Sequence, residues 1–397
     1  MRGPTLKCAL AALLPSLLAT TIGTAAVASA APEGSVKLPV MPSRLDAGDP
    51  CTGASAKVAS AAPWEQRNLE LPRTWQFAGG AGEKVAVVDT GVSTTAPALA
   101  GAVTPVGGAA QDCVGHGTFV AGLIAAARVE GVHFAGVAQR ARILAVRGTD
   151  QRGNATAGTV AAGIRAAVDA GASVIDVSPA LTGNSAELRS AVSYAAGHDA
   201  LVVAAAVPDP TRGTGASAPP PRAYWPAAQP GVLSVVDVDQ NGGRPRGALT
   251  PLGADLAAPG VGVIGVGPTG KGHFIGSGAS LAAAYVAGTA ALVRSAYPRL
   301  TAAETARRLT TAAYPAPVPR LDPYASVTSV GDSAAHHSAG AARHAAPVSL
   351  PSSAAGDRAT RRALLLAALG AAVVLLVGWA SVIVPRGRAR GWRPARD

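Results

Sequence analysis

Short apolar runs alternate with amphipathic stretches through the central part of the chain, from residue 84 onward. Each apolar run is four to seven residues long, as in buried strands, and the stretches between them place apolar residues at helical spacing. This alternation predicts an α/β fold: a mostly parallel sheet with helices on both faces. The predicted strands are 84–88, 143–146, 173–177, 201–206, 232–238 and 261–266, and the predicted helices are 116–127, 156–170, 185–196, 280–296 and one opening at the capping box 301–304.

The first apolar segment lies at the N-terminus. Arg2 and Lys7 precede a mostly apolar stretch, which ends at the small residues Ala28-Ser29-Ala30. A charged start, an apolar centre and a small-residue end are typical of a cleaved secretion signal. We therefore predict a signal peptide over residues 1–30, with an uncleaved membrane anchor as the alternative.

The second apolar segment, residues 363–384, contains no charged residue. Its 22 residues would extend about 33 Å as a helix, enough to cross the hydrocarbon core of a membrane. The arginines after it outnumber the two before it, so the tail at 385–397 is predicted to stay in the cytoplasm. With a cleaved signal ahead of it, the main domain would lie outside the cell membrane, joined to the lipid bilayer by 363–384.

The net charge of +11 is concentrated at these two ends. Seven of the arginines lie between residues 361 and 397, and the first 30 residues carry two basic residues and no acid. The central part is therefore close to neutral, which argues against a nucleic-acid partner. The basic excess instead fits a membrane protein and excludes a soluble cytoplasmic one.

Composition divides the remaining chain into three parts. Residues 31–83 are rich in Pro and Ala with little periodicity, and are predicted to form an N-terminal extension outside the core. Residues 84–325 form the predicted main domain, and 326–362 a flexible linker rich in Ala, Ser and Pro. The linker contains His336, His337 and His344. We expect them to be solvated, and metal binding is the alternative.

Export also bears on the cysteines. Without the signal, the chain keeps Cys51 and Cys113. An oxidising compartment favours one disulfide between them, and two free thiols are the alternative.

Three short motifs carry an acid, a histidine and a serine, in that order. Asp89-Thr90-Gly91 ends a predicted strand, Gly115-His116-Gly117-Thr118 opens a helix, and Gly278-Ala279-Ser280 opens another. Nucleophilic acyl transfer needs a hydroxyl, a base to take its proton, and a carboxylate to hold that base in one tautomer. In an open α/β sheet such groups gather at strand C-termini and at the helix starts that follow them. This chemistry requires no cofactor, and no cluster of acids typical of a metal site stands out.

In these motifs the chain resembles the subtilisin-like serine proteases, over about residues 64–311. The resemblance implies a subtilisin-like fold, a protein or peptide substrate, and a catalytic triad. Asp89 would orient the imidazole, His116 would act as general base and then acid, and Ser280 would be the nucleophile. Ser178, Pro179 and Ala180 correspond to the backbone strip that binds an extended substrate, where Pro179 lacks an N–H group.

Further positions narrow the resemblance: Pro63-Trp64, Leu69, Trp75, Gly80-Ala81-Gly82, Cys113 and the run 225–233. In these the chain resembles the mycosins, membrane-anchored subtilases associated with type VII (ESX) secretion. The resemblance implies a type VII secretion membrane complex as partner, and a disulfide between Cys51 and Cys113 that ties the extension down beside His116.

Four positions depart from the subtilase pattern. Pro208 stands where the family has the Asn that helps to hold the oxyanion, so the Ser280 N–H group would be left as donor. Asp176 replaces another Asn in a strand predicted to be buried, where an unpaired carboxylate is costly or stays protonated. Ala279 and Ala284 replace the usual Thr and Pro. Asn184 is an alternative source of the missing amide, although a surface turn is the ordinary role for such a residue.

These features leave three hypotheses. The favoured one is a membrane-anchored serine endopeptidase whose activity is weakened by the lost amide. The second is a pseudo-protease acting as a structural subunit of a secretion complex. The third is an ordinary secreted degradative subtilase, which the C-terminal anchor disfavours.

Overall fold

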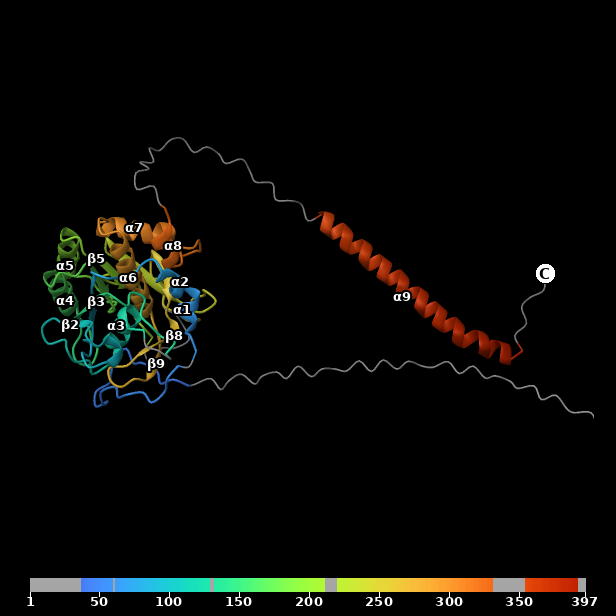
Figure 1. Ribbon diagram of the computed structural model, residues 1–397, viewed down its shortest axis with the longest axis horizontal. Coiled ribbons are helices and arrows are strands. Elements are labelled where there is room, and N and C mark those ends of the chain that lie inside the picture. Colours follow the sequence, from blue (N-terminus) through green and yellow to red (C-terminus); the bar gives the residue numbers. More distant parts are fainter. Residues whose placement is uncertain (1–36, 60, 129–131, 211–219, 331–353, 392–397) are drawn as a thin grey trace, which may run out of the picture. The chain divides into compact units, whose positions relative to one another are not determined.

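The computed structural model describes residues 37–59, 61–128, 132–210, 220–330 and 354–391. It divides into two units, one ending at residue 330 and one comprising the described residues from 354 onward, and each is described by itself (Figure 1). The predicted signal peptide at 1–30 and the linker histidines lie outside the described residues.

A seven-stranded parallel sheet forms the centre of the first unit. Its strands are β1 (Lys84–Asp89), β2 (Val103–Pro105), β3 (Arg142–Arg147), β4 (Val174–Val177), β5 (Leu201–Ala205), β6 (Val232–Val238) and β7 (Leu256–Pro259). Their order is β2-β3-β1-β4-β5-β6-β7, and every neighbouring pair is parallel. The chain passes from β1 to β2 and β3 on one side of β1 and then crosses from β3 to β4 on its other side. In such a sheet, ligands bind beyond the carboxyl ends of the strands at the point where the order reverses.

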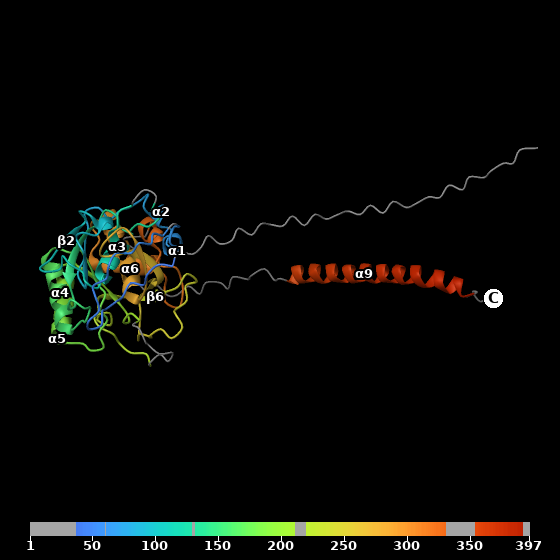
Figure 2. The same cartoon turned by 90° about the horizontal axis from the view of Figure 1, so that it is seen from below.

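Helices cover both faces of the sheet, which confirms the predicted fold class. The helices α3 (His116–Ala125) and α6 (Ala279–Ala296) pack on one face, and α4 (Ala157–Asp169) and α5 (Ala186–Gly197) on the other (Figures 1 and 2). Strand side chains alternate between these two layers, so that Val85 and Val87 face α3 and α6 while Ala86 and Val88 face α4 and α5. Alanine and glycine let the buried helix α6 lie close to the sheet.

The predicted strand 261–266 is β8 (Val261–Val266), which forms an antiparallel hairpin with β9 (His273–Ser277) beside α3. Several short elements were not predicted. They are the strands β2, β7 and β9, the helices α1 (Trp64–Asn68), α2 (Leu71–Thr74) and α8 (Pro323–Thr328), and the 3-10 turn η1 (Pro97–Leu99). The predicted capping box does open α7 (Ala302–Ala312), where Thr301 and Glu304 bond each other's backbone N–H groups.

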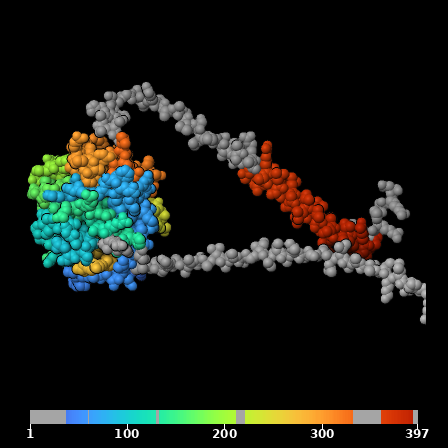
Figure 3. All heavy atoms as spheres, viewed as in Figure 1, coloured from blue at the N-terminus to red at the C-terminus, as the bar shows by residue number. Residues whose placement is uncertain are grey.

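The N-terminal extension is part of the core, and the prediction that it lies outside is wrong. Met41, Leu69 and Leu71 are buried in the same cluster as α3 and α6. The backbone of the extension also pairs with β9, where the Met41 N–H donates to the Ile275 carbonyl over 2.9 Å. Figure 3 shows this blue segment on the surface beside the orange-yellow residues of the hairpin. Low periodicity misled the prediction because the extension supplies single anchors rather than one apolar face.

A disulfide joins Cys51 to Cys113 across a separation of 62 residues. Beside it, the Thr52 N–H donates to the Cys113 carbonyl over 2.9 Å, and the Thr52 hydroxyl donates to the Val114 carbonyl over 2.6 Å. The extension is therefore fastened immediately before α3 begins.

The end of the first unit differs from the predicted boundary at residue 325. That position falls inside α8, where Ser326 and Val327 are buried, because α8 packs on α6 and α7. Most of the predicted linker lies outside the described residues.

The second unit is one helix, α9 (Ala354–Ala389), which contains the whole apolar segment 363–384 and begins within the predicted linker. Among the described residues, α6 and the stretch Thr360–Ala389 are the two helices long and apolar enough to cross a membrane. Only α6 is buried within the fold, so its composition is explained by the core.

Glu65 on α1 is a fully buried carboxyl group. Its Oε1 accepts a hydrogen bond from the Ile264 N–H over 2.9 Å, and it lies close to the Tyr285 hydroxyl. Burial raises the pKa of Glu65 from 4.5 to about 7. Between these two values the folded protein keeps a proton that the unfolded chain releases, so stability is lost as the pH rises.

We expect Glu65→Gln to remove this dependence. Between pH 4.5 and about 7, the free energy of unfolding of the wild type should fall relative to the variant by about 1.4 kcal/mol per pH unit. Urea unfolding across this range measures the difference. Glu70→Gln, which alters an exposed ion pair with Arg73, is the control and should change little. Parallel curves for wild type and Glu65→Gln would contradict the prediction.

Candidate active site

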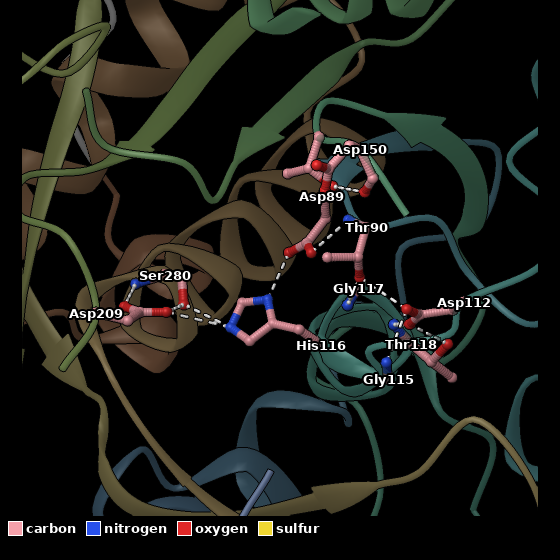
Figure 4. A network of polar contacts seen from close by, with 11 residues as sticks. Asp89, Thr90, Asp112, Gly115, His116, Gly117, Thr118, Asp150, Asp209 and Ser280 are labelled. Atoms are coloured by element: carbon pink, nitrogen blue, oxygen red, sulfur yellow. Dashed lines mark hydrogen bonds and ion pairs between the residues drawn. The ribbon is translucent and has the colours of Figure 1, made fainter. Parts of the chain in front are cut away.

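The structure brings Asp89, His116 and Ser280 together at the carboxyl end of β1. Asp89 ends that strand, His116 is the first residue of α3, and Ser280 lies in the first turn of α6 (Figure 4). His116 Nδ1 lies 2.8 Å from Asp89 Oδ2, and His116 Nε2 lies 3.1 Å from Ser280 Oγ. These distances connect the carboxylate, imidazole and hydroxyl in the order that acyl transfer requires.

A second buried carboxylate, Asp112, fixes the position of His116. Its Oδ1 accepts from the Thr90 hydroxyl over 2.8 Å and from the Gly115 N–H over 2.7 Å. Its Oδ2 accepts from the N–H and the hydroxyl of Thr118, over 2.8 and 2.7 Å. Asp112 thereby ties the end of β1 to the first turn of α3.

Close backbone contact completes this junction. A Cβ atom added to Gly117 would lie 2.1 Å from the Gly91 carbonyl oxygen, so only glycine fits there. The Gly117 N–H also donates to the Thr90 hydroxyl over 3.0 Å. The glycines of both sequence motifs therefore let the strand end and the helix start touch.

Burial and charge set the protonation of the His116 imidazole. Burial lowers its pKa, but Asp89 and Asp209 oppose this effect and raise the pKa well above its ordinary value. Burial likewise raises the pKa of Asp89, whereas the charge and hydrogen bond of His116 bring it below its ordinary value. The carboxyl groups of Asp89 and Asp209, one at each ring nitrogen, thus favour the protonated form of the imidazole.

Asp209 is a site residue that was not predicted from the sequence. Its Oδ2 lies 3.1 Å from His116 Nε2 and 2.5 Å from Ser280 Oγ, and its Oδ1 accepts from the Ser280 N–H over 3.1 Å. Pro208, the residue predicted to replace the family's Asn, precedes it directly and has no N–H group. Asp209 belongs to no motif, and its position directly after Pro208 is the one signal in the sequence that could have indicated it.

Asn184 does not replace the amide at Ser280. Its side-chain oxygen accepts from the Ser185 N–H over 2.9 Å and from Gln229 Nε2 over 3.3 Å. Asn184 therefore belongs to the turn before α5, the ordinary role considered for it.

The predicted substrate strip lies beside this cluster. Ser178, Pro179 and Ala180 line a cavity of about 290 Å³ that Asp89, His116 and Asp209 also line. Ser178 is buried, whereas Pro179 and Ala180 are partly exposed. Ala279 and Ala284, the two altered positions of the serine motif, are buried in α6.

Asp176 on β4 is fully buried, as the sequence predicted, and neither of its carboxyl oxygens has a hydrogen-bond partner. Burial, and after it the charge of Asp89, raises the pKa of Asp176 well above its ordinary value. The two acids near the triad thus differ: Asp112 is surrounded by donors and Asp176 by none.

Comparison with known proteins places these features in one family. Residues 80–342 match the model of the subtilase family, Peptidase_S8. The chain is 30% identical to mycosin-4 of Mycobacterium tuberculosis, in an alignment that covers 90% of this chain and 89% of that protein.

Two solved structures share the fold. The crystal structure of MycP1 from Mycobacterium smegmatis has a TM-score of 0.62 and 27% identity, covering 74% of this chain and 92% of its own. A chain in the periplasmic assembly from the ESX-5 inner membrane complex has a TM-score of 0.64 and 27% identity, covering 79% and 95% respectively.

The two buried acids generate opposite predictions. Asp112→Asn replaces an acceptor by an NH₂ donor facing the donors of Thr118 or Gly115, so it should lower the free energy of unfolding by about 1–3 kcal/mol.

Asp176→Asn removes a buried carboxyl group that the unfolded chain ionises more easily. Stability is therefore lost in the wild type as the pH rises towards the raised pKa of Asp176, and the variant should be the more stable protein at pH 8.

Urea unfolding at pH 8 tests both variants, and each serves as the matched control for the other. Because both replace a buried aspartate by asparagine, a general effect of the substitution would shift both midpoints in one direction. Such a common shift would contradict the account of the two acids given above.

Proposed function

Because this chain belongs to the subtilase family and is of the mycosin type, we propose that it is a serine endopeptidase whose catalytic residues are Asp89, His116 and Ser280. The observation that carries this proposal is the continuous path of contacts from Asp89 through His116 to Ser280 Oγ. The link to type VII secretion comes from the mycosins that the chain is similar to over most of its length.

The geometry supports the following mechanism. Ser280 Oγ attacks the peptide carbonyl carbon while its proton passes to His116 Nε2, and Asp89 holds the Nδ1 proton that fixes the tautomer. The developing oxyanion accepts from the Ser280 N–H at the start of α6. His116 then gives its proton to the leaving amine, and water releases the acyl group by the reverse sequence of transfers.

The substrate would extend along Ser178, Pro179 and Ala180. These residues follow β4 at the same edge of the sheet as the triad and line the same cavity. Pro179 provides no N–H group, so one main-chain contact available in an ordinary strip is missing here.

We further propose that activity near neutral pH is weak. The family's amide donor is replaced, and in subtilisin itself the loss of one such donor lowers turnover by about 10²–10³. A protonated His116 is also unable to accept the Ser280 proton, and the pKa of His116 lies well above its ordinary value.

The second candidate function is a structural subunit of a secretion complex. Two observations favour it: Asp209 occupies the cleft beside Ser280, and one structural relative is a chain of the ESX-5 inner membrane complex assembly. A type VII secretion membrane complex is the proposed partner under either function.

We propose that residues 363–384 cross the cell membrane once, with residues 84–325 outside and the basic tail 385–397 in the cytoplasm. The long apolar stretch of α9 supports this arrangement, and so do the arginines after it: Arg386, Arg388 and Arg390. Residues 1–30 would be the cleaved signal and 31–83 the extension, and the linker would begin after residue 330, where the first unit ends.

The endopeptidase proposal predicts that a fluorophosphonate probe labels Ser280 in the full-length protein. Peptide mapping by mass spectrometry identifies the labelled residue. Ser280→Ala should abolish labelling, and His116→Ala should reduce it at least 10³-fold because the base is lost. Absence of label on the wild type between pH 4 and 9 would contradict the proposal.

In the native host, Ser280→Ala separates the two functions. An endopeptidase role predicts that this variant fails in the same way as deletion of the gene. Normal secretion with Ser280→Ala, but not with the deletion, would favour the structural subunit.

The topology predicts opposite cysteine accessibilities on the two sides of the span. Val330→Cys, at an exposed position before it, should react with a membrane-impermeant maleimide in intact cells. Gly391→Cys, after it, should react only once the cells are permeabilised. Reaction of both cysteines in intact cells, or of Gly391→Cys alone, would contradict the proposed orientation.

A further inference from the structure

The Asp209 carboxyl group sits where a substrate carbonyl would bind. In acyl transfer the carbonyl oxygen accepts from the N–H group of the serine, and here Asp209 Oδ1 is the acceptor, at 3.1 Å. Asp209 Oδ2 contacts both the hydroxyl and the imidazole (Figure 4). The serine N–H, the serine hydroxyl and the imidazole can each donate a hydrogen bond to this carboxyl group.

The surroundings are shaped for this carboxyl group. The Asp209 side chain is 9% exposed, although the residue follows the end of β5 in a connecting segment. A Cβ atom on Gly278 would lie 2.0 Å from Asp209 Oδ1, so the glycine of the serine motif provides the space that the carboxyl oxygen fills. Asp209 is therefore a packed part of the cleft.

Neither Pro208 nor Asn184 supplies a second donor at this position. Pro208 has no N–H, and Asn184 is bonded to Gln229. Among the described residues, Asp209 is the one side chain with a recorded hydrogen bond to the Ser280 N–H. A carboxyl group can donate a hydrogen bond only when it carries a proton.

We propose, on the basis of the function proposed above, that Asp209 is a further catalytic residue: as a neutral acid it donates the second hydrogen bond to the oxyanion, and as a carboxylate it blocks that position. Substrate entry turns the side chain away from the Ser280 N–H, and the O–H group then points to the oxyanion from the β5 side. One residue thereby replaces the lost amide and makes its use depend on protonation.

The atoms balance in the acylation step. The Ser280 Oγ–H bond breaks and its proton moves to His116 Nε2, while the Oγ–carbon bond forms and the carbonyl π electrons move to the oxygen. That oxygen accepts hydrogen bonds from the Ser280 N–H and the Asp209 O–H. Asp209 keeps its proton throughout, and the collapse of the intermediate follows the usual route through His116.

Two protonation sites in contact control the active form. The productive form has a proton on Asp209 and none on His116 Nε2. It carries the same number of protons as the form with an Asp209 carboxylate and a His116 imidazolium, so the two forms differ only in where the proton lies. Further protonation removes the base, and loss of the shared proton removes the donor, so a pH profile with two limbs follows. Among the described residues, the titratable or charged groups that act on or contact Asp209 are His116 from α3, Asp176 from β4 and Asp237 from β6. Asp89 lies behind the imidazole, and Arg244 pairs with Asp237.

The test compares the rate constant for fluorophosphonate labelling of Ser280 between pH 4 and 9 in three forms of the full-length protein. The wild type should show both limbs, with labelling falling about tenfold per pH unit on the alkaline side. Asp209→Asn carries a permanent donor, so it should lose the alkaline limb and exceed the wild type by about 10²-fold or more at pH 9. Asp209→Ala should also lose that limb but remain about 10²–10³-fold slower than Asp209→Asn at every pH.

Each remaining outcome has a defined meaning. Equal rates for Asp209→Asn and Asp209→Ala would overturn the donor role, and an unchanged alkaline limb in both variants would overturn the proposal as a whole. If the wild type is labelled and one of these two results is found, the inference about Asp209 fails but the proposed endopeptidase function stands. Absence of label in all three folded proteins refutes the function and the inference together. Thermal unfolding of each variant shows whether it is folded, and Ser280→Ala combined with Asp209→Asn must not label.

Discussion

The buried imidazole of His116 between two carboxylates is the interaction on which the rest of the cleft depends. It joins the end of β1, the start of α3 and the segment after β5, and through Ser280 it reaches the start of α6. Charges removed from water are stable only when they compensate one another. In the absence of substrate Asp209 contacts both His116 and Ser280, so the resting cleft is a closed network of polar contacts. A substrate that enters must separate Asp209 from both of its donors, and therefore competes with a contact built into the protein.

Much of the fold could be predicted from the sequence, because long buried elements have strong periodicity. The strands 232–238 and 261–266 have the predicted bounds, and the buried runs that became β1, β3 and β4 differ by one residue at each end or less. The elements that were missed are short. The strand β2 has three residues and β7 has four, and neither contains enough positions for a pattern to show. The helices α1 and α2 pack through individual anchors, so their contribution to the core appears only in three dimensions.

The candidate site shows the same division. Asp89, His116 and Ser280 lie in motifs whose glycines and spacing identify them, and the structure brings their side chains together. Asp209 and Asp112 lie in no motif. Their importance comes from where the backbone directs a carboxyl group: Asp112 towards the N–H groups at the start of α3, and Asp209 towards those at the start of α6. The family pattern draws attention to Pro208, whereas the side chain that lies in the cleft is that of the next residue, Asp209.

The anchoring of the extension limits how such a protein can be switched on. Leu69 and Leu71 fill the interior ahead of β1, and the Trp75 indole N–H donates to the Val137 carbonyl over 2.8 Å. Cutting the chain just before Lys84 would remove these side chains and leave a cavity in the core. Activation by cleavage before Lys84, with loss of the whole extension, would therefore destabilise the folded domain.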